Sequence, residues 1–146
     1  RRIWIEDESR RIGRCVIPKD IWISMRDSDV VFLERNVEER VSYLLQGYGS
    51  FSAADLQACA ERIKKRFGND RTKKLHELIG AGELREAIVM VLEYYDRGYQ
   101  HGLSLREECR VERVYVEGFD HRVVAQRLVA HQEERERKED RSVDLL

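Results

Sequence analysis

The sequence lacks the features that mark membrane and secreted proteins. No apolar run approaches the roughly 18 residues needed to cross a membrane, and no signal-peptide pattern occurs. The three cysteines, Cys15, Cys59 and Cys109, are widely spaced and form no Cys-x-x-Cys pair, which suits a reducing cytosol. We therefore expect a cytoplasmic protein without a membrane segment.

An excess of one charge sign is also missing. There are 27 Lys and Arg residues against 28 Asp and Glu residues, so the net charge is −1 although charged residues make up 38% of the chain. Overall charge thus argues neither for nor against nucleic acid, and only local clusters are informative. At 146 residues the chain is long enough for one domain. Arg rather than Met at position 1 leads us to expect a piece of a longer protein.

A phosphate-binding glycine loop is the third absence. The sequence contains no G-x-x-x-x-G-K-[ST] motif and no glycine-rich turn between a strand and a helix. A complete phosphate-loop nucleotide-binding domain is therefore excluded for this chain by itself.

What the chain does contain is an apolar stretch that ends in acids. Residues 3–6 predict a short buried strand because Ile3 and Ile5 are β-branched. The carboxyl ends of parallel strands are where ligands bind, and strand-then-acid is the order that positions Mg²⁺ or a catalytic water in phosphate-loop domains. The alternative is a strand that runs into a solvated acidic turn. Candidates are Glu6, Asp7, Glu8 and Ser9 as an acidic edge, Asp7 and Glu8 as metal ligands, and Arg10 as a phosphate contact.

The remaining pattern predicts alternating helices and strands. Strands are expected at residues 30–34 and 111–118, and helices at 19–26, 37–45, 52–67, 70–79, 82–95 and from 120 onward. Three strands, each followed by helix, predict an α/β three-layer sandwich with a parallel sheet and a helical insertion. We expect one domain over residues 1–130 and a charged, disordered tail over 131–146.

Positive charge concentrates in one place. Residues 62–74 contain seven basic residues against Asp70 alone, and two helix ends meet there at Gly68. Such a cluster suits an RNA backbone or a diphosphate, although cations also offset the dipole of a helix end. Arg40, early in a helix that follows a strand, could likewise contact phosphate or form a surface ion pair. The candidate phosphate or RNA contacts are Arg10, Arg40, Lys64, Lys65, Arg66, Lys73 and Lys74.

An unusual aromatic segment covers residues 93–102, which we expect to be a loop after a helix end. Tyrosine and histidine can stack on bases, and an aspartate can hold a ribose hydroxyl. The alternative is a packing corner in which the tyrosine rings are buried and their hydroxyls solvated. The candidate substrate contacts are Tyr94, Tyr95, Asp96, Tyr99 and His101.

Several of these segments together resemble the tRNA 2-selenouridine synthase family. The resemblance lies in Trp4-Ile5-Glu6-Asp7-Glu8-Ser9-Arg10-Arg11-Ile12-Gly13, in Arg62-Ile63-Lys64-Lys65-Arg66-Phe67-Gly68, and in Leu92-Glu93-Tyr94-Tyr95-Asp96 with Tyr99. It runs from about Arg2 to Leu128. It implies an enzyme that joins an N-terminal rhodanese domain, bearing a catalytic cysteine, to a C-terminal phosphate-loop domain.

The resemblance implies a chemistry as well as a fold. Members act on the wobble uridine of tRNA: geranyl diphosphate alkylates the sulfur of a 2-thiouridine, and selenium from selenophosphate then replaces that sulfur. This chain resembles only the C-terminal part of the phosphate-loop domain, and the rhodanese and phosphate-loop segments are missing from it. No cysteine here inherits the nucleophile's role, so we expect the chain alone to be inactive.

Two other functions fit the residues. The strand and helix around Arg40 are also the layout of a small-molecule phosphate-loop kinase, of which this chain would be half a domain. The basic residues 62–74 fit a non-catalytic tRNA-binding module. A kinase-type sheet places the loop-bearing strand between residues 3–6 and 30–34, so we expect these two segments to run parallel about 10 Å apart.

Overall fold

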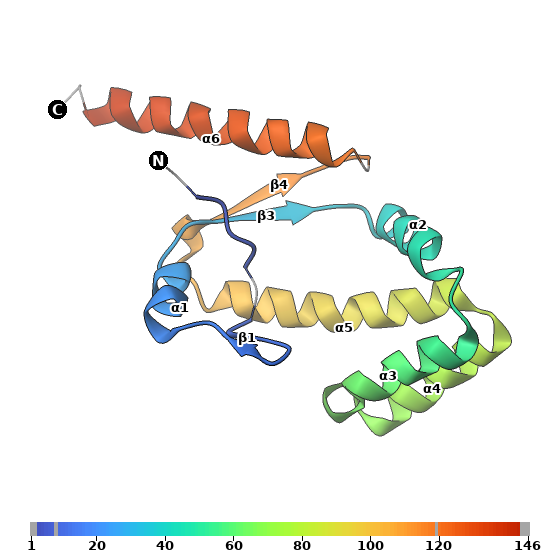
Figure 1. Ribbon diagram of the computed structural model, residues 1–146. Coiled ribbons are helices and arrows are strands. Elements are labelled where there is room, and N and C mark those ends of the chain that lie inside the picture. The colour runs from blue at the N-terminus through green and yellow to red at the C-terminus, as the bar shows by residue number, and fades with distance from the viewer. Residues whose placement is uncertain (1–2, 8, 119, 144–146) are drawn as a thin grey trace. The chain divides into compact units, whose positions relative to one another are not determined.

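The computed structural model describes residues 3–7, 9–118 and 120–143. It is a mixed α/β structure with a small parallel sheet (Figure 1). By its contacts the chain divides after Tyr115 into two units, and the second consists mainly of one helix. The elements are β1 (Arg11–Ile12), β2 (Cys15–Val16), α1 (Lys19–Arg26), β3 (Val30–Glu34), α2 (Val37–Tyr48), α3 (Ala53–Phe67), α4 (Asn69–Ala81), α5 (Leu84–Ser104), a short 3₁₀ turn (Glu108–Arg110), β4 (Val111–Tyr115) and α6 (His121–Val143).

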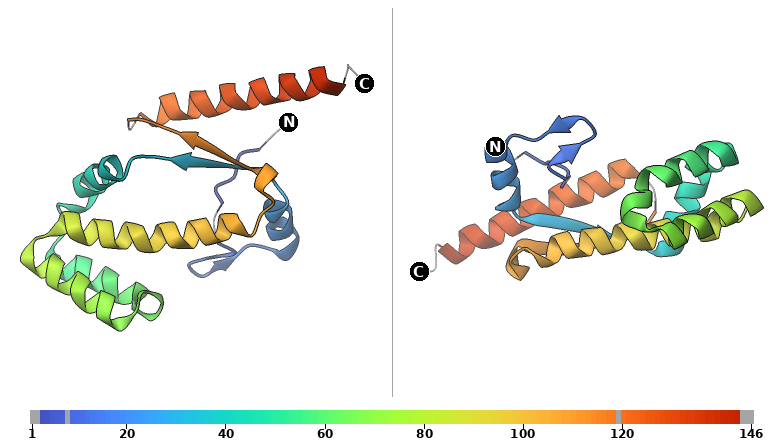
Figure 2. Two further views of the ribbon diagram at one scale, coloured as in Figure 1. Left: turned by 180° about the vertical axis from the view of Figure 1, so that it is seen from behind. Right: turned by 90° about the horizontal axis from the view of Figure 1, so that it is seen from below.

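The parallel sheet pairs the two strands that the sequence predicted at residues 30–34 and 111–118. β3 and β4 run parallel in a register that places Val30 opposite Val111 and Glu34 opposite Tyr115. The residues of β3 are only half-buried, and Leu33 is exposed. The described residues thus contain a two-stranded parallel sheet (Figure 2).

The strand predicted at residues 3–6 was wrong. Residues 3–7 have no regular secondary structure, and Ile3 and Ile5 are 82% and 61% exposed. Consequently the expected parallel arrangement of residues 3–6 and 30–34 is not formed. An apolar, β-branched sequence favours a strand only where another strand satisfies its backbone hydrogen bonds, and none pairs with it here. The nearby pairing is instead the β1–β2 hairpin, whose turn uses Gly13 at a φ of +59°.

Most helices begin where their capping residues predicted. The Asn36 side chain accepts a hydrogen bond from the Glu38 amide at the start of α2, and the Ser52 hydroxyl accepts one from the Asp55 amide at the start of α3. Asp120 accepts from the Arg122 amide before α6. Helix ends agree less well: α2 continues through Gly47 to Tyr48, beyond the end predicted at residue 45.

Residues 93–102 are helical, so the loop predicted there was wrong. α5 continues unbroken to Ser104 because the segment has no proline, and Gly98 and Gly102 each cost only about 1 kcal/mol inside a helix. Leu92 and Leu103 are both buried, and their spacing of three helical turns keeps one face inward. α6 similarly continues to Val143, so most of the tail expected to be disordered is helical.

The core of the first unit lies where α3, α4 and α5 meet. Phe67, Leu75 and Ile79 are buried together with Ala60, Leu78 and Ala87. Cys59, on α3, is exposed and lies outside this core. Gly68 joins α3 to α4 at a φ of +97°, a conformation that strains any residue with a Cβ. This single-residue connection makes α3 and α4 a tight helical hairpin. No helix in the described part of the chain combines the length and apolar character of a membrane span.

Candidate functional site

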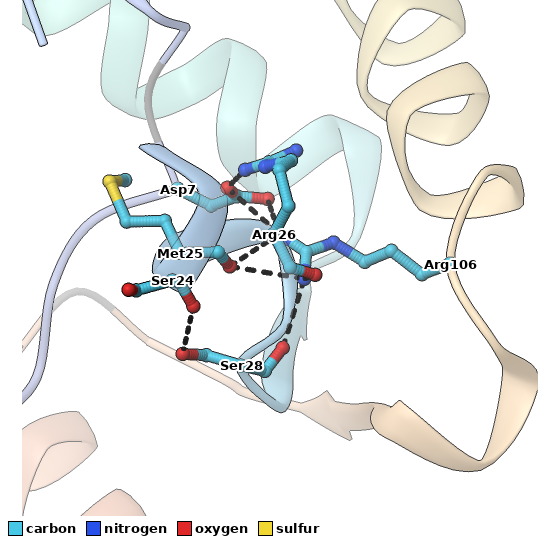
Figure 3. A network of polar contacts seen from close by, with 6 residues as sticks. All are labelled: Asp7, Ser24, Met25, Arg26, Ser28 and Arg106. Carbon is cyan, nitrogen blue, oxygen red and sulfur yellow. Dashed lines mark hydrogen bonds and ion pairs between the residues drawn. The ribbon is translucent and has the colours of Figure 1, made fainter. Parts of the chain in front are cut away.

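The acidic segment is held by two arginines that the sequence did not suggest. Arg106, in the segment after α5, has a side chain only 4% exposed. Its Nη2 donates to both carboxylate oxygens of Asp7, at 3.1 and 3.2 Å, and Arg26 at the end of α1 forms a second ion pair with the same carboxylate (Figure 3). Asp7 is therefore enclosed between two guanidinium groups.

Arg106 also holds the end of α1. Its Nη1 donates to the carbonyl oxygens of Arg26 at 3.0 Å and of Ser28 at 2.9 Å, and Arg110 donates to the carbonyl of Asp27. A cation at a helix C-terminus offsets the partial negative charge of the last carbonyls. These bonds fix the segment that enters β3 against the segment that enters β4.

The charge balance in this cluster is unusual, because two cations share one carboxylate. Burial lowers the pKa of Arg26, and the charge of Arg106 lowers it further. Burial also lowers the pKa of Arg106. Both guanidinium groups stay protonated at neutral pH because the ordinary arginine pKa is so high. Arg26 additionally stacks on Trp22, with its Cζ 4.3 Å from the ring centroid.

This geometry does not fit the predicted metal site. Asp7 lies beside residues 25–28 and 106, which precede β3 and β4, so it is near the amino ends of the parallel strands rather than their carboxyl ends. Its oxygens are engaged by arginines, and within the described residues no group of three or more His, Cys, Asp or Glu side chains could hold a metal. Glu8 lies outside the described residues. Asp7 in this arrangement is therefore not available as a ligand for Mg²⁺.

The other residues of the acidic edge contribute to the local fold. The Ser9 hydroxyl donates to the carbonyl of Arg11 at 2.7 Å, and Arg10 Nε donates to the carbonyl of Ile17 at 3.4 Å. Both bonds support the β1–β2 hairpin. Glu6 is exposed and belongs to no regular element.

Arg40 and Asp96, predicted as members of two separate sites, bind each other. The two guanidinium nitrogens of Arg40 on α2 donate to the two Asp96 oxygens on α5, at 2.8 and 2.7 Å. The side-chain hydrogen bond to Asp96 raises the pKa of Arg40. This bidentate pair links α2 to α5 and leaves the charge of Arg40 balanced, which disfavours the kinase-like role for Arg40. The surface ion pair considered as an alternative is therefore present, but with α5 instead of its own helix.

The aromatic residues of α5 divide into buried and exposed members. Tyr94 packs against the hairpin core, with its ring edge-on to Phe67 at 5.2 Å and to Tyr95 at 5.2 Å. The packing alternative thus applies to Tyr94. Tyr95 and Tyr99 are 45% and 54% exposed one helical turn apart, and His101 is also exposed.

The basic residues of 62–74 lie on the α3–α4 hairpin, close to its Gly68 turn. Lys64 is paired with Glu61 at 3.0 Å and Lys74 with Glu77 at 3.9 Å, whereas no ion pair is described for Lys65, Arg66 or Lys73. All three of the latter are exposed. The predicted cations Lys64, Lys65, Arg66, Lys73 and Lys74 therefore lie on one hairpin, and we call its Gly68 side the positively charged hairpin end. Arg10 and Arg40 lie outside it.

Sequence reasoning missed Arg26 and Arg106 altogether. Arg106 is separated from Asp7 by 99 positions and from Met25, whose carbonyl it also contacts, by 81. No local spacing rule connects residues so distant, and arginines at helix ends are ordinarily surface groups. Only the fold shows that the Arg106 side chain is buried and that Arg26 lies partly buried beside it.

Comparison with known proteins gives one consistent family. The family described as the tRNA 2-selenouridine synthase AAA domain matches residues 1–135. Curated proteins named tRNA 2-selenouridine synthase are similar to the chain: that of Marinobacter nauticus is 30% identical over 72% of the chain, that of Pseudomonas syringae 29% over 83%, and that of Azotobacter vinelandii 29% over 85%. The chain spans only 36–40% of the length of these relatives. No solved structure matches it significantly.

Proposed function

The chain belongs to the tRNA 2-selenouridine synthase family, and from this membership we propose that it is the C-terminal part of a cytoplasmic enzyme that converts a wobble 2-thiouridine of tRNA to 2-selenouridine. In this proposal geranyl diphosphate alkylates the sulfur and releases diphosphate. Selenophosphate then adds its selenium to the same ring carbon, the sulfur leaves as geranylthiol, and water cleaves the Se–P bond to release phosphate. The match over residues 1–135 is the observation that carries the proposal. Both donors and the tRNA are phosphate anions, which the positively charged hairpin end would attract.

The short sheet supports incorporation into a larger fold. We propose that β3 and β4 belong to the parallel sheet of a three-layer phosphate-loop sandwich whose other strands come from a preceding part of the protein. A two-stranded sheet buries little apolar surface, and the relatives are more than twice as long as the chain. Residues 3–5 are apolar, exposed and without regular secondary structure in this chain, so they are available to pair with a neighbouring strand when one is present.

This idea makes a prediction for backbone amides of residues 3–6. In the isolated chain they are expected to exchange with solvent at nearly the rate of an unstructured peptide, whereas in a longer protein with the neighbouring strand they should be protected by at least about tenfold. Hydrogen exchange followed by mass spectrometry measures the difference. Residues 30–34, paired in both forms, serve as the internal control. Equal exchange of residues 3–6 in both forms would contradict the proposed sheet.

The isolated chain is expected to form no 2-selenouridine. Its cysteines are exposed single thiols, and its sequence contains no phosphate-binding glycine loop. The test incubates the purified chain with 2-thiouridine tRNA, geranyl diphosphate and selenophosphate, and then measures nucleosides by mass spectrometry. Formation of 2-selenouridine without another protein would refute the assignment of catalysis to the missing parts.

The decisive experiment for the whole proposal uses the complete reading frame around this chain. Its upstream DNA is expected to encode an in-frame glycine-rich Gly-Lys-Ser/Thr loop, and the complete protein should restore 2-selenouridine to tRNA in a bacterial strain that lacks it. A frame with that loop that yields ATP-dependent phosphorylation of a small molecule, but no 2-selenouridine, would favour the kinase alternative. RNA binding without any chemistry would favour the non-catalytic module.

A further inference from the structure

The fold brings an exposed tyrosine close to the positively charged hairpin end, although the sequence separates them by about thirty residues. Phe67 is the last residue of α3, directly after Arg66 and before the Gly68 turn. Its ring contacts Tyr94 at a centroid distance of 5.2 Å, and Tyr94 contacts Tyr95 at the same distance. Two ring contacts therefore join the basic end of α3 to Tyr95.

The three rings have different environments. Phe67 is 3% exposed and Tyr94 is half-buried against the hairpin core, so both support the fold. Tyr95 is 45% exposed and is held by the Tyr94 ring at an interplanar angle of 67°. Tyr95 is thus a positioned aromatic side chain on a rigid helix, with surface available to a ligand.

The helix dipole accounts for only part of the nearby positive charge. Lys64, Lys65 and Arg66 are in the last turn of α3, where cations stabilise the helix. Arg71, by contrast, lies in the first turn of α4 and Lys73 just beyond it, where the dipole disfavours cations. Helix stability therefore does not account for these two cations, which are exposed and available to an anionic partner.

An exposed ring beside several cations has the chemistry of a surface for unpaired nucleic acid. Bases of single strands stack on aromatic side chains, while Lys and Arg contact the phosphates. Bases inside a duplex are already stacked on one another and would leave the Tyr95 ring unused. We propose that Tyr95, together with Lys65, Arg66 and Lys73, binds an unpaired RNA segment by stacking one base on the tyrosine ring.

This inference rests on the proposed function, because a wobble uridine lies in an unpaired loop of tRNA. It names the residues that would bind such an unpaired segment. Tyr94 has a supporting role only. Arg40 and Asp96, which balance each other's charge, are not assigned to the surface.

The test measures RNA binding by the 146-residue chain using fluorescence anisotropy. The probes are a single-stranded RNA, its duplex with the complementary strand, and the same single strand with abasic positions in its centre. The chain is expected to bind the single strand more tightly than the duplex. Tyr95→Leu should weaken single-strand binding by about five- to a hundredfold, the usual effect of losing one stacked base, whereas Tyr95→Phe should retain it. Tyr115→Leu, another exposed tyrosine, is the matched control and should bind as the original chain does.

The phosphate contacts are tested by salt dependence. Replacing Lys65, Arg66 and Lys73 with Gln should reduce the slope of log affinity against log salt by about 0.7 for each phosphate that is no longer neutralised. The control, Gln at Lys19, Arg122 and Arg127, removes the same charge from other exposed positions and should leave the slope nearly unchanged.

Specific outcomes overturn the inference. Base stacking on Tyr95 would be excluded if the chain bound the duplex more tightly than the single strand, or if Tyr95→Leu and Tyr95→Phe bound the single strand equally well. It would also be excluded if Tyr95→Leu weakened binding to the abasic strand as much as binding to the intact strand. Unfolding curves of the variants exclude loss of structure as the cause. If base stacking on Tyr95 is excluded but the complete protein still forms 2-selenouridine, the proposed function stands and only this inference is refuted. If the chain binds the single strand as expected but the complete protein forms no 2-selenouridine, the proposed function is refuted and the RNA-binding surface stands.

Discussion

Phe67→Ala is expected to destabilise the chain by about 3–5 kcal/mol, the usual cost of removing a buried phenylalanine. Phe67 is 3% exposed at the centre of the α3–α4–α5 core, and its ring meets Tyr94 edge-on at 5.2 Å. The substitution removes the buried surface, leaves a cavity and abolishes the ring contact. Equilibrium unfolding in urea, followed by circular dichroism, measures the loss.

Phe51→Ala is the matched control for this variant. Phe51 precedes α3, is 54% exposed and contacts Tyr48 at 6.0 Å, so its loss should cost less than about 1 kcal/mol. Phe67→Ala is also expected to weaken RNA binding, because the core sets the position of Tyr95. A stability equal to that of Phe51→Ala would contradict the role of Phe67 as the centre of the core.

Arg106→Ala is expected to cost about 3 kcal/mol and to lower the melting temperature by about 10 °C. The substitution leaves the carbonyls of Arg26 and Ser28 without this donor and removes one of the two guanidinium groups around Asp7. Asp7 is partly exposed, and its remaining pair with Arg26 limits the loss. Differential scanning calorimetry measures the shift.

Two further substitutions separate the geometry of Arg106 from its charge. Arg106→Lys keeps the positive charge but loses the planar fork that reaches Asp7 and the carbonyls together, so it should recover only part of the stability. Arg71→Ala removes an exposed arginine of the same unit and should change stability by no more than about 0.5 kcal/mol. Equal effects of Arg106→Ala and Arg71→Ala would show that the Asp7 cluster contributes nothing.

The candidate site was only partly accessible from the sequence. The clustering of the cations of residues 62–74 could be predicted because they lie close together in the sequence, and their exposure follows from the amphipathic pattern of α3 and α4. The pairing of Arg40 with Asp96 could not be found, because it depends on how α2 lies against α5. The sequence also could not show that Tyr95 is exposed while Tyr94 is half-buried, because this depends on α5 continuing through a segment expected to be a loop.

Local sequence was sufficient to predict the elements whose hydrogen bonds are local. Asn36, Ser52 and Asp120 cap helices because their side chains accept bonds from amides two or three residues away, and Gly68 ends α3 because it can adopt a positive φ. Long-range packing, by contrast, selected which apolar segment became a strand. β3 found β4 as a parallel partner, whereas residues 3–6 have no paired strand. Packing also placed Asp7 between Arg26 and Arg106 near the amino ends of the sheet, because backbone pairing and buried charge both need partners from distant parts of the chain.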